Sequence, residues 1–216
     1  MIVIDAHKLA YAALPKAACS SVKKALAAVD PEASLSAEEA RDVHSYHLLY
    51  PTARFHPRRT AGLEDHFRFA VVRDPLARLL SVWTNRVLEF GDLRNAWSLQ
   101  SGRADLPMEP DVDFFFQNLD GYAQAVSSIK HHVLPARLFL GDDLDFYSQV
   151  YRTSELSGLA QDLSDWTRQG VSIPRSNRSA TRLEAADLAG ETLAAIRPRL
   201  DAEYDYLSRF YENPFG

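Results

Sequence analysis

The apolar positions of the chain follow two patterns, short continuous runs and stripes at helical spacing. Continuous runs predict buried strands at residues 9–14 and 69–72, and we expect a further strand at residues 146–152. Stripes with a period near 3.6 residues predict helices, which begin near Cys19, Pro75, Val112, Glu155, Leu183 and Leu200. Strands and helices in this order indicate the α/β class, and we expect a three-layer sandwich with a central parallel sheet.

Four segments are less regular. Residues 33–43 indicate a loop and a short polar helix, and residues 43–51 (VHSYHLLYP) a strand or a strand that leads into a turn. Residues 89–113 combine glycines, prolines and mixed charges, which indicates a loop excursion. This excursion is either a wall or lid that binds a substrate, or a surface insertion. Residues 174–183 (PRSNRSATRL) predict a basic loop between the last two helices.

Composition restricts the class of protein further. A chain of 216 residues, 46% of them hydrophobic, has room for one sizeable core, so we expect a single domain over residues 1–216. A net charge of -5 argues against nucleic acid or an anionic membrane as partner. No run of 18 apolar residues and no signal-like start occur, and we expect a soluble, cytoplasmic protein without a transmembrane segment. The oligomeric state is not indicated.

The first junction of a strand and a helix, residues 15–21 (PKAACSS), carries the groups of an anion site. A helix N-terminus offers N–H donors and the positive end of the dipole, and Lys16, Ser20 and Ser21 add a charge and two hydroxyls. We therefore predict a phosphate site. The loop differs from the nucleotide-hydrolase pattern GxxxxGK[ST], because the lysine precedes the turn and the glycines are missing, which argues against an ordinary kinase or GTPase.

The single cysteine of the chain, Cys19, lies in this loop. One cysteine excludes an intrachain disulfide and a cysteine-based zinc site, and it suits a reducing compartment. Cys19 does not fit a phosphatase nucleophile either, since such a loop needs an arginine six residues later and Ala25 stands there. We interpret it as a small buried thiol under the loop.

A second junction lies within residues 68–83 (RFAVVRDPLARLLSVW). Arg73 follows the strand, Asp74 suits the N-cap of the next helix, and Pro75 suits its first position. We predict that Arg73 and Ser81 reach one anionic ligand beside the strand end. The alternative is a buried strand and a capped helix on which Asp74 and Arg78 form a local ion pair.

The two stretches PKAACSSVKKAL and FAVVRDPLARLLSVW, in this order and about sixty residues apart, carry a resemblance. They resemble the paired signature of sulfotransferases that use 3′-phosphoadenosine 5′-phosphosulfate (PAPS), in particular the carbohydrate (Golgi-type) sulfotransferase family 2 and its short bacterial relatives. The resemblance implies a P-loop NTPase-like sulfotransferase fold. It also implies transfer of a sulfuryl group to a hydroxyl of a carbohydrate or small-molecule acceptor, with 3′,5′-ADP as product and no metal.

The resemblance also implies a role for each motif. The first loop would cradle the 5′-phosphosulfate, and Arg73 with Ser81 would hold the 3′-phosphate. A loop near residues 177–179 would close over the nucleotide, the alternative being an exposed basic loop. Ala18 stands where the family usually has glycine. The cofactor-binding residues so implied are Lys16, Ala17, Ala18, Cys19, Ser20, Ser21, Arg73, Ser81 and Arg178.

Sulfuryl transfer needs a base near the acceptor hydroxyl, and histidine titrates near neutral pH. We predict His44 as this base, because it resembles the histidine that precedes the second motif in several carbohydrate sulfotransferases. Lys16 would neutralise charge on the departing 5′-phosphate oxygen. His47 is the alternative base and shares a face with His44 only if the segment is helical. His132, which matches a family histidine three residues before a proline, is a further candidate on the acceptor side.

Two alternatives of other classes remain open. One is a nucleotide or small-molecule kinase with an atypical, P-loop-like phosphate loop. The other is a non-catalytic relative of the sulfotransferases that binds a nucleotide or glycan without turnover, which only Ala18 favours. Neither an HExxH pattern nor a partnered carboxylate spacing accompanies the histidines, so we predict no metal site.

Overall fold

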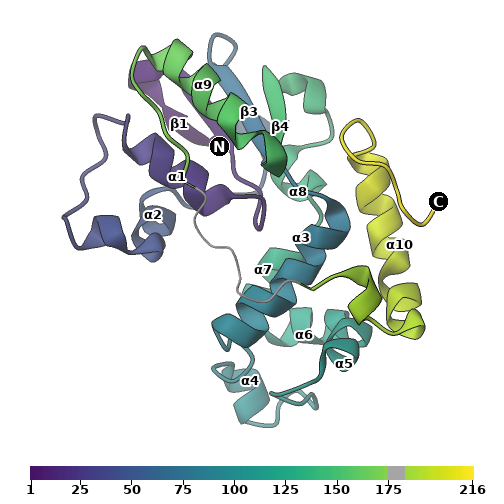
Figure 1. Ribbon diagram of the computed structural model, residues 1–216. Helices are drawn as coiled ribbons and strands as arrows, with labels where there is room; N and C mark the ends of the chain where they lie inside the picture. The colour runs from purple at the N-terminus through teal and green to yellow at the C-terminus, as the bar shows by residue number, and fades with distance from the viewer. Residues whose placement is uncertain (175–182) are drawn as a thin grey trace. The chain divides into compact units, whose positions relative to one another are not determined.

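The computed structural model describes residues 1–174 and 183–216 (Figure 1). The predicted contacts Asn177, Arg178 and Ser179 lie outside the described residues. The chain divides into two compact units, each made of two segments. Unit 1 comprises Met1–Arg73 and Ala136–Arg178, and unit 2 comprises Asp74–Pro135 and Ser179–Gly216. The expected single domain stays a prediction.

Unit 1 contains a four-stranded sheet in the order β1-β2-β3-β4. β2 (Leu9–Ala12), β3 (Phe67–Val72) and β4 (Gln149–Arg152) are parallel, as predicted. β1 (Ile2–Ile4) is antiparallel to β2, so the prediction of a fully parallel sheet is wrong at this edge. The physical reason is the connection, a single 3₁₀ turn at Asp5–His7, because a parallel neighbour needs a crossover of a dozen residues or more.

One face of the sheet carries the core of unit 1. The register pairs Tyr11 with Phe69, and their rings stack with centroids 5.0 Å apart. Helices α1 (Cys19–Ala27) and α9 (Leu156–Thr167) pack on this face, as their apolar stripes predict. The helical residues in this core include Val22, Leu26, Leu156, Leu159 and Leu163.

Residues 43–49 form a helix, α2 (Val43–Leu49), so the prediction of a strand there is wrong. Asp42 caps it, since its Oδ1 accepts a hydrogen bond from the His44 amide at 3.0 Å. Tyr46 is buried while Leu48 is exposed. The apolar residues at positions 43, 46 and 50 have helical spacing, and this is the signal that the strand prediction overlooked.

The remaining elements of unit 1 are short. They are the α-helix α8 (Arg137–Leu140) and the 3₁₀ turns Glu39–Arg41, Pro57–Arg59, Leu144–Phe146 and Thr153–Glu155.

Unit 2 is helical and has its own core, in which Leu80, Trp83, Phe115 and Tyr204 are buried. Its second segment also contains the 3₁₀ turn Ala185–Asp187. In the part of the chain that the structure describes, no helix is both long and apolar enough to cross a membrane. The helices of unit 2 are α3 (Pro75–Val82), a π-helical segment (Trp83–Glu89), α4 (Trp97–Gln100), α5 (Val112–Gln117), α6 (Leu119–Ala125), α7 (Ser127–Val133) and α10 (Gly190–Tyr206).

Two helix predictions in unit 2 are wrong in their boundaries. The single helix predicted from Val112 is three helices, α5 to α7, because the backbone leaves the helical region at Asn118 and Val126. Conversely, the two helices predicted near the C-terminus share the single helix α10, which continues through Pro198. Ile196 and Leu200, on either side of this proline, are buried, and their packing outweighs the hydrogen bond that proline removes.

The start of α3 is as predicted. Pro75 occupies its first turn, and Asp74 Oδ1 accepts a hydrogen bond from the Ala77 amide at 2.8 Å. Arg78, however, pairs with Glu203 of α10 rather than with Asp74. The second oxygen of Asp74 accepts a hydrogen bond from the Tyr204 hydroxyl at 2.8 Å. The local Asp74–Arg78 ion pair is therefore replaced by two contacts between α3 and α10.

Candidate active site

The loop between β2 and α1 has an unusual backbone. Lys16 and Ala18 both have positive φ, 66° and 57°. The Ala17 amide donates to the Leu14 carbonyl at 3.2 Å, which closes the turn between them. A left-handed backbone costs a residue with a side chain roughly 1–2 kcal/mol. The loop therefore holds strain at two positions, and strain of this kind gathers where a backbone binds a ligand.

The N-terminus of α1 has no side-chain cap. Ala18 is its N-cap residue and supplies no acceptor, whereas Asp42, Asp74 and Asp111 cap other helices of the chain. The amides of Cys19 and Ser20 have no acceptor within the helix, because the first turn of any α-helix lacks one. With the positive end of the helix dipole, this start has the properties of an anion site.

The two sequence motifs meet through Arg73 and Lys16. Arg73 Nη1 donates to the Lys16 carbonyl oxygen at 3.2 Å, and both residues are half-buried. Lys16 follows β2 and Arg73 follows β3. These two strands are parallel neighbours, so their carboxyl ends lie at the same end of the sheet. The structure therefore brings the predicted lysine and arginine together in unit 1.

Ser81, the other predicted residue of the second motif, lies on α3 in unit 2. It is half-buried, and its Oγ donates to the Arg78 carbonyl at 2.7 Å. Arg73 is the last residue of the first segment of unit 1. That Arg73 and Ser81 hold one phosphate stays a prediction.

The two candidate bases lie one turn apart on α2, and they differ in exposure. His44 is exposed, whereas His47 is half-buried. Nε2 of His47 lies 2.8 Å from Ser20 Oγ, so α2 contacts the first loop through this histidine. The assignment of the base to His44 stays a prediction.

Lys23 contacts His47, although no sequence pattern singled out this lysine. Its side chain is completely buried, with Nζ 2.7 Å from Thr52 Oγ1 and 3.1 Å from His47 Nδ1. Burial lowers the pKa of Lys23, and the nearby Cys19 opposes this change more weakly. The signal in the sequence is its spacing: Lys23 follows Cys19 by four residues, which puts it on the inner side of α1.

Burial of Cys19 is as predicted, and Ser21 on α1 is also buried; that the other residues of the first loop bind the cofactor stays a prediction. Ala17 is completely buried, and Cys19 is a buried thiol beneath the loop. Two residues on either side of β4, Tyr147 and Glu155, make structural contacts. The Tyr147 hydroxyl donates to the Leu140 carbonyl at 2.8 Å, and Glu155 Oε2 accepts a hydrogen bond from the Arg152 amide at 2.7 Å.

His132 lies on α7 in unit 2. Nδ1 of His132 is 2.7 Å from the Ser128 carbonyl oxygen, which makes Nδ1 the protonated nitrogen in this contact. A role on the acceptor side stays a prediction.

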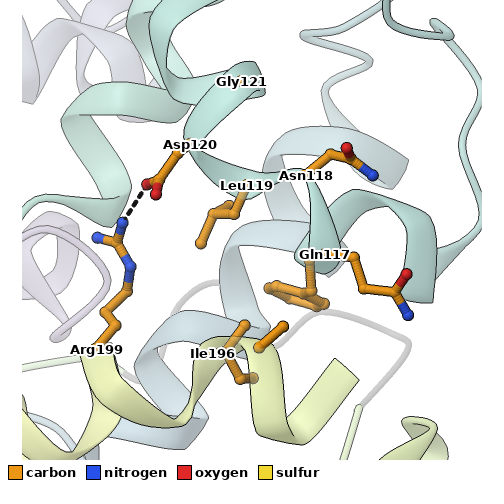
Figure 2. Close-up of a pocket in the computed structure, with 9 residues that line it drawn as sticks. Gln117, Asn118, Leu119, Asp120, Gly121, Ile196 and Arg199 are labelled. Atoms are coloured by element: carbon orange, nitrogen blue, oxygen red, sulfur yellow. Dashed lines mark hydrogen bonds and ion pairs between the residues drawn. The ribbon is translucent and has the colours of Figure 1, made fainter. Parts of the chain in front are cut away.

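Unit 2 also contains a cavity of about 250 Å³ beside the turn between α5 and α6, where Asp120 and Arg199 form an ion pair at 2.5 Å (Figure 2). Neither His132 nor Ser81 lines this cavity.

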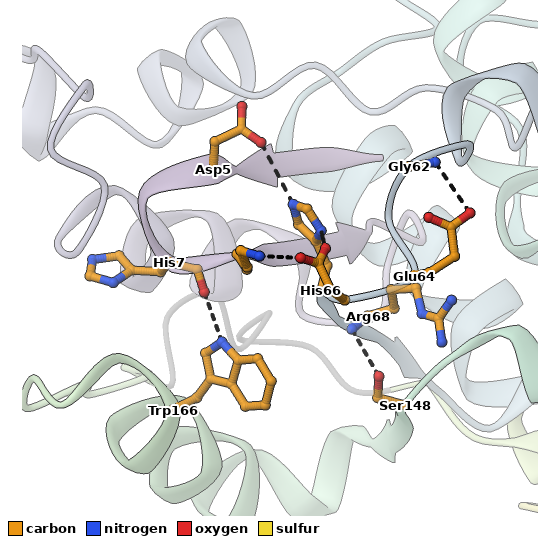
Figure 3. A network of polar contacts seen from close by, with 10 residues as sticks. Asp5, His7, Gly62, Glu64, His66, Arg68, Ser148 and Trp166 are labelled. Atoms are coloured by element: carbon orange, nitrogen blue, oxygen red, sulfur yellow. Dashed lines mark hydrogen bonds and ion pairs between the residues drawn. The ribbon is translucent and has the colours of Figure 1, made fainter.

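His66 belongs to a polar network at the opposite end of the strands (Figure 3). Its Nδ1 lies 3.0 Å from Asp65 Oδ1, and its Nε2 lies 3.6 Å from Asp5 Oδ1. The Arg68 amide, near the start of β3, donates to Ser148 Oγ at 3.1 Å, and Trp166 Nε1 donates to the His7 carbonyl. This network joins the amino ends of parallel strands, away from Lys16 and Arg73, and we interpret it as structural.

Within residues 1–174 and 183–216, no three histidine, cysteine or carboxylate side chains are grouped so that they could hold a metal ion.

Comparison with models of known protein families gives one match. The model of the sulfotransferase family matches residues 1–198, a range that includes both motifs, α2 and Lys23. Comparison with curated proteins and with solved structures gave no match.

Proposed function

The chain belongs to the sulfotransferase family, and we propose that it transfers a sulfuryl group from PAPS to a hydroxyl of a carbohydrate or small-molecule acceptor, with release of 3′,5′-ADP. The observation that carries the proposal is the contact of Arg73 with the Lys16 carbonyl. It joins two cationic residues of separate motifs at one edge of the sheet. A donor with phosphate groups at both its 3′ and 5′ positions needs such a pair.

The residues at this edge fit the anionic groups of that donor. Lys16 supplies an ammonium, Ser20 a hydroxyl, and the uncapped start of α1 supplies amides. Positive φ at Lys16 and Ala18 turns neighbouring amides toward one side, an arrangement that binds anions. Each charge-assisted hydrogen bond contributes about 1.5–3 kcal/mol. We further propose that β2, the loop and α1 correspond to the phosphate-binding unit of a P-loop NTPase-like, three-layer sulfotransferase fold.

The bound donor supplies the sulfuryl group, and the chain supplies charge and a base. Lys16 and the amides at the start of α1 neutralise negative charge that develops on the departing 5′-phosphate oxygen. His44 accepts the proton of the acceptor hydroxyl on a ring nitrogen. Its neighbour His47 contacts Ser20, so α2 is attached to the loop at a point about 5 Å along the helix from His44.

Thermal stabilisation tests the donor. At one hundred times its dissociation constant, 3′,5′-ADP adds about 2.7 kcal/mol to the free energy of unfolding. For a chain of this length, that corresponds to a rise in Tm of about 5–11 °C. Stabilisation by ATP with magnesium, and not by 3′,5′-ADP, would reject the proposal in favour of a kinase.

Transfer itself requires a second measurement. Radiolabelled PAPS incubated with a panel of saccharides and small hydroxyl compounds should give a labelled acceptor. Binding of 3′,5′-ADP without transfer to any member of a broad panel would favour the non-catalytic relative instead. A range of acceptors in this assay also identifies the substrate class.

A further inference from the structure

We propose that Lys23 is a positioning residue of this site: through His47, it orients the Ser20 hydroxyl so that it donates a hydrogen bond to the bound anion. The identity of that anion, the 5′-phosphosulfate of the donor, rests on the proposed function. The orientation itself rests on contacts among residues 20–52 alone.

Four side chains form a continuous series of polar contacts. Thr52 Oγ1 accepts a hydrogen bond from Lys23 Nζ at 2.7 Å, and the same Nζ lies 3.1 Å from His47 Nδ1. The other ring nitrogen of His47, Nε2, lies 2.8 Å from Ser20 Oγ. Lys23 is completely buried, and the other three residues are half-buried. The series therefore begins in the interior and ends at the loop.

The chemistry of lysine sets the direction of these hydrogen bonds. An ammonium has three donors and no acceptor, so His47 Nδ1 accepts from Lys23 Nζ. In a neutral imidazole the other nitrogen then carries the proton, and Nε2 donates to Ser20 Oγ. With its oxygen already accepting, Ser20 directs its own proton to another acceptor.

Ser20 is the second residue of α1, where the amides also point out of the helix start. Its hydroxyl proton and these amides therefore converge on one anion. Hydrogen bonds in series polarise one another in a medium of low dielectric constant. Lys23 in this way adds positive potential to the loop while its ammonium stays in the interior. Lys16, by contrast, is only half-buried.

The same direction separates the roles of the two histidines. Because Nε2 of His47 carries the proton, His47 presents a donor and not a lone pair to the loop. It is therefore unsuited to remove a proton from an acceptor hydroxyl. This agrees with the proposal that His44 is the base.

The tautomer of His47 is the first test. Nitrogen-15 spectra of the ligand-free protein report which ring nitrogen of each of the seven histidines is protonated, and loss of a signal in His47→Gln identifies His47. We expect protonated Nε2 and unprotonated Nδ1 in the wild type, and a mixture of tautomers in Lys23→Met. The opposite tautomer in the wild type would overturn the proposal, even if Lys23→Met does not fold.

A double-mutant cycle is the second test, with 3′,5′-ADP as the ligand. Lys23→Met should raise its dissociation constant about tenfold, which corresponds to about 1.4 kcal/mol. If Lys23 acts through Ser20, the same change in a Ser20→Ala background should have less than a threefold effect. Additive effects of the two changes would show a merely structural role and overturn the proposal.

The adjacent Lys24 provides a matched control, because it is exposed on α1. Lys24→Met should change neither the tautomer of His47 nor the affinity. The two tests also separate this proposal from the proposed function. If the wild type does not bind 3′,5′-ADP, the proposed function fails, whereas the tautomer in the ligand-free protein still decides the role of Lys23.

Discussion

Arg78 of α3 and Glu203 of α10 form an ion pair at 2.8 Å in the interior of unit 2, where their side chains are only 6% and 8% exposed. Arg78 Nη2 also donates to the Leu134 carbonyl at 3.0 Å. A buried ion pair contributes little net stability compared with apolar residues of similar size, but loss of one partner leaves a buried charge without compensation. The two residues therefore depend on each other.

We expect Glu203→Leu to lower the free energy of unfolding by about 3–5 kcal/mol, and the double variant Arg78→Met/Glu203→Leu to lower it by much less. Urea denaturation measures both. The exposed pair Arg94–Glu109 is the control, and its loss should change stability by less than about 1 kcal/mol. Equal losses in the single and double variants would contradict this account.

Alkaline pH should destabilise the protein through buried tyrosines. Burial, and then the hydrogen bond to Asp74, raise the pKa of Tyr204 above its usual value of 10.0. Above pH 10 the folded state therefore keeps a proton that the unfolded chain loses. The stabilising contribution is complete below pH 10 and is lost as pH rises through the raised pKa.

The variant Tyr204→Phe isolates this effect. Its free energy of unfolding should fall less steeply above pH 10 than that of the wild type, by up to about 1.4 kcal/mol per pH unit. At pH 7 it should be less stable by about 1 kcal/mol, because the Asp74 hydrogen bond is lost. Denaturation curves at a series of pH values measure both quantities, and identical slopes would contradict the prediction.

Arg73→Ala should weaken binding of 3′,5′-ADP more than tenfold, since a charge-assisted hydrogen bond contributes about 1.5–3 kcal/mol. Calorimetry measures the affinity, and far-UV circular dichroism checks that the fold is intact. Arg137→Ala is the control, because Arg137 is exposed and pairs with Asp142. A loss below tenfold with an intact fold would return Arg73 to a structural role at the end of β3.

Ala18→Gly should stabilise the protein by about 0.5–1 kcal/mol. Glycine relieves the left-handed strain at φ 57°, which outweighs its larger entropy in the unfolded chain. Ala17→Gly is the control, because Ala17 is completely buried and is not among the residues with positive φ. It should destabilise. A stabilising Ala17→Gly, or a destabilising Ala18→Gly, would show that strain is not held at Ala18.

His44→Ala should lower the rate of sulfuryl transfer by about 10²–10⁴-fold, because it removes the general base. The affinity for 3′,5′-ADP should stay unchanged, which separates this variant from Lys23→Met and Arg73→Ala. Single-turnover measurements with labelled PAPS give the rate. An unchanged rate would reject His44 as the base and leave the reaction class intact.

Local patterns predicted the elements that carry their own signals. β3, the cap at Asp74 and the start of α3 follow from a continuous apolar run and from residue types that suit a helix N-terminus. The buried thiol of Cys19 was predicted in the same way, because the loop lacks the arginine that a phosphatase nucleophile would need. These features depend on a few neighbouring residues.

Predictions failed where distant contacts decide. One failure was local instead: α2 begins at the cap residue Asp42 and has apolar residues at helical spacing, but the same residues also suit a strand. The role that we propose for Lys23 depends on its contacts with His47 and Thr52, which follow it in the sequence by more than twenty residues. No pattern within α1 alone indicates that a lysine on its inner face has polar partners.

The division of unit 1 into two segments has a consequence for synthesis on the ribosome. β4 completes the parallel sheet by pairing with β3, but it belongs to the second segment. The whole first segment of unit 2 is translated between these strands. The newly made chain therefore carries β3 with one edge unpaired until β4 emerges, and delayed pairing of this kind makes folding slow and exposes a strand edge to aggregation. Translation speed through residues 74–148, and the chaperones present at that stage, should therefore affect the yield of folded protein more than changes near either terminus.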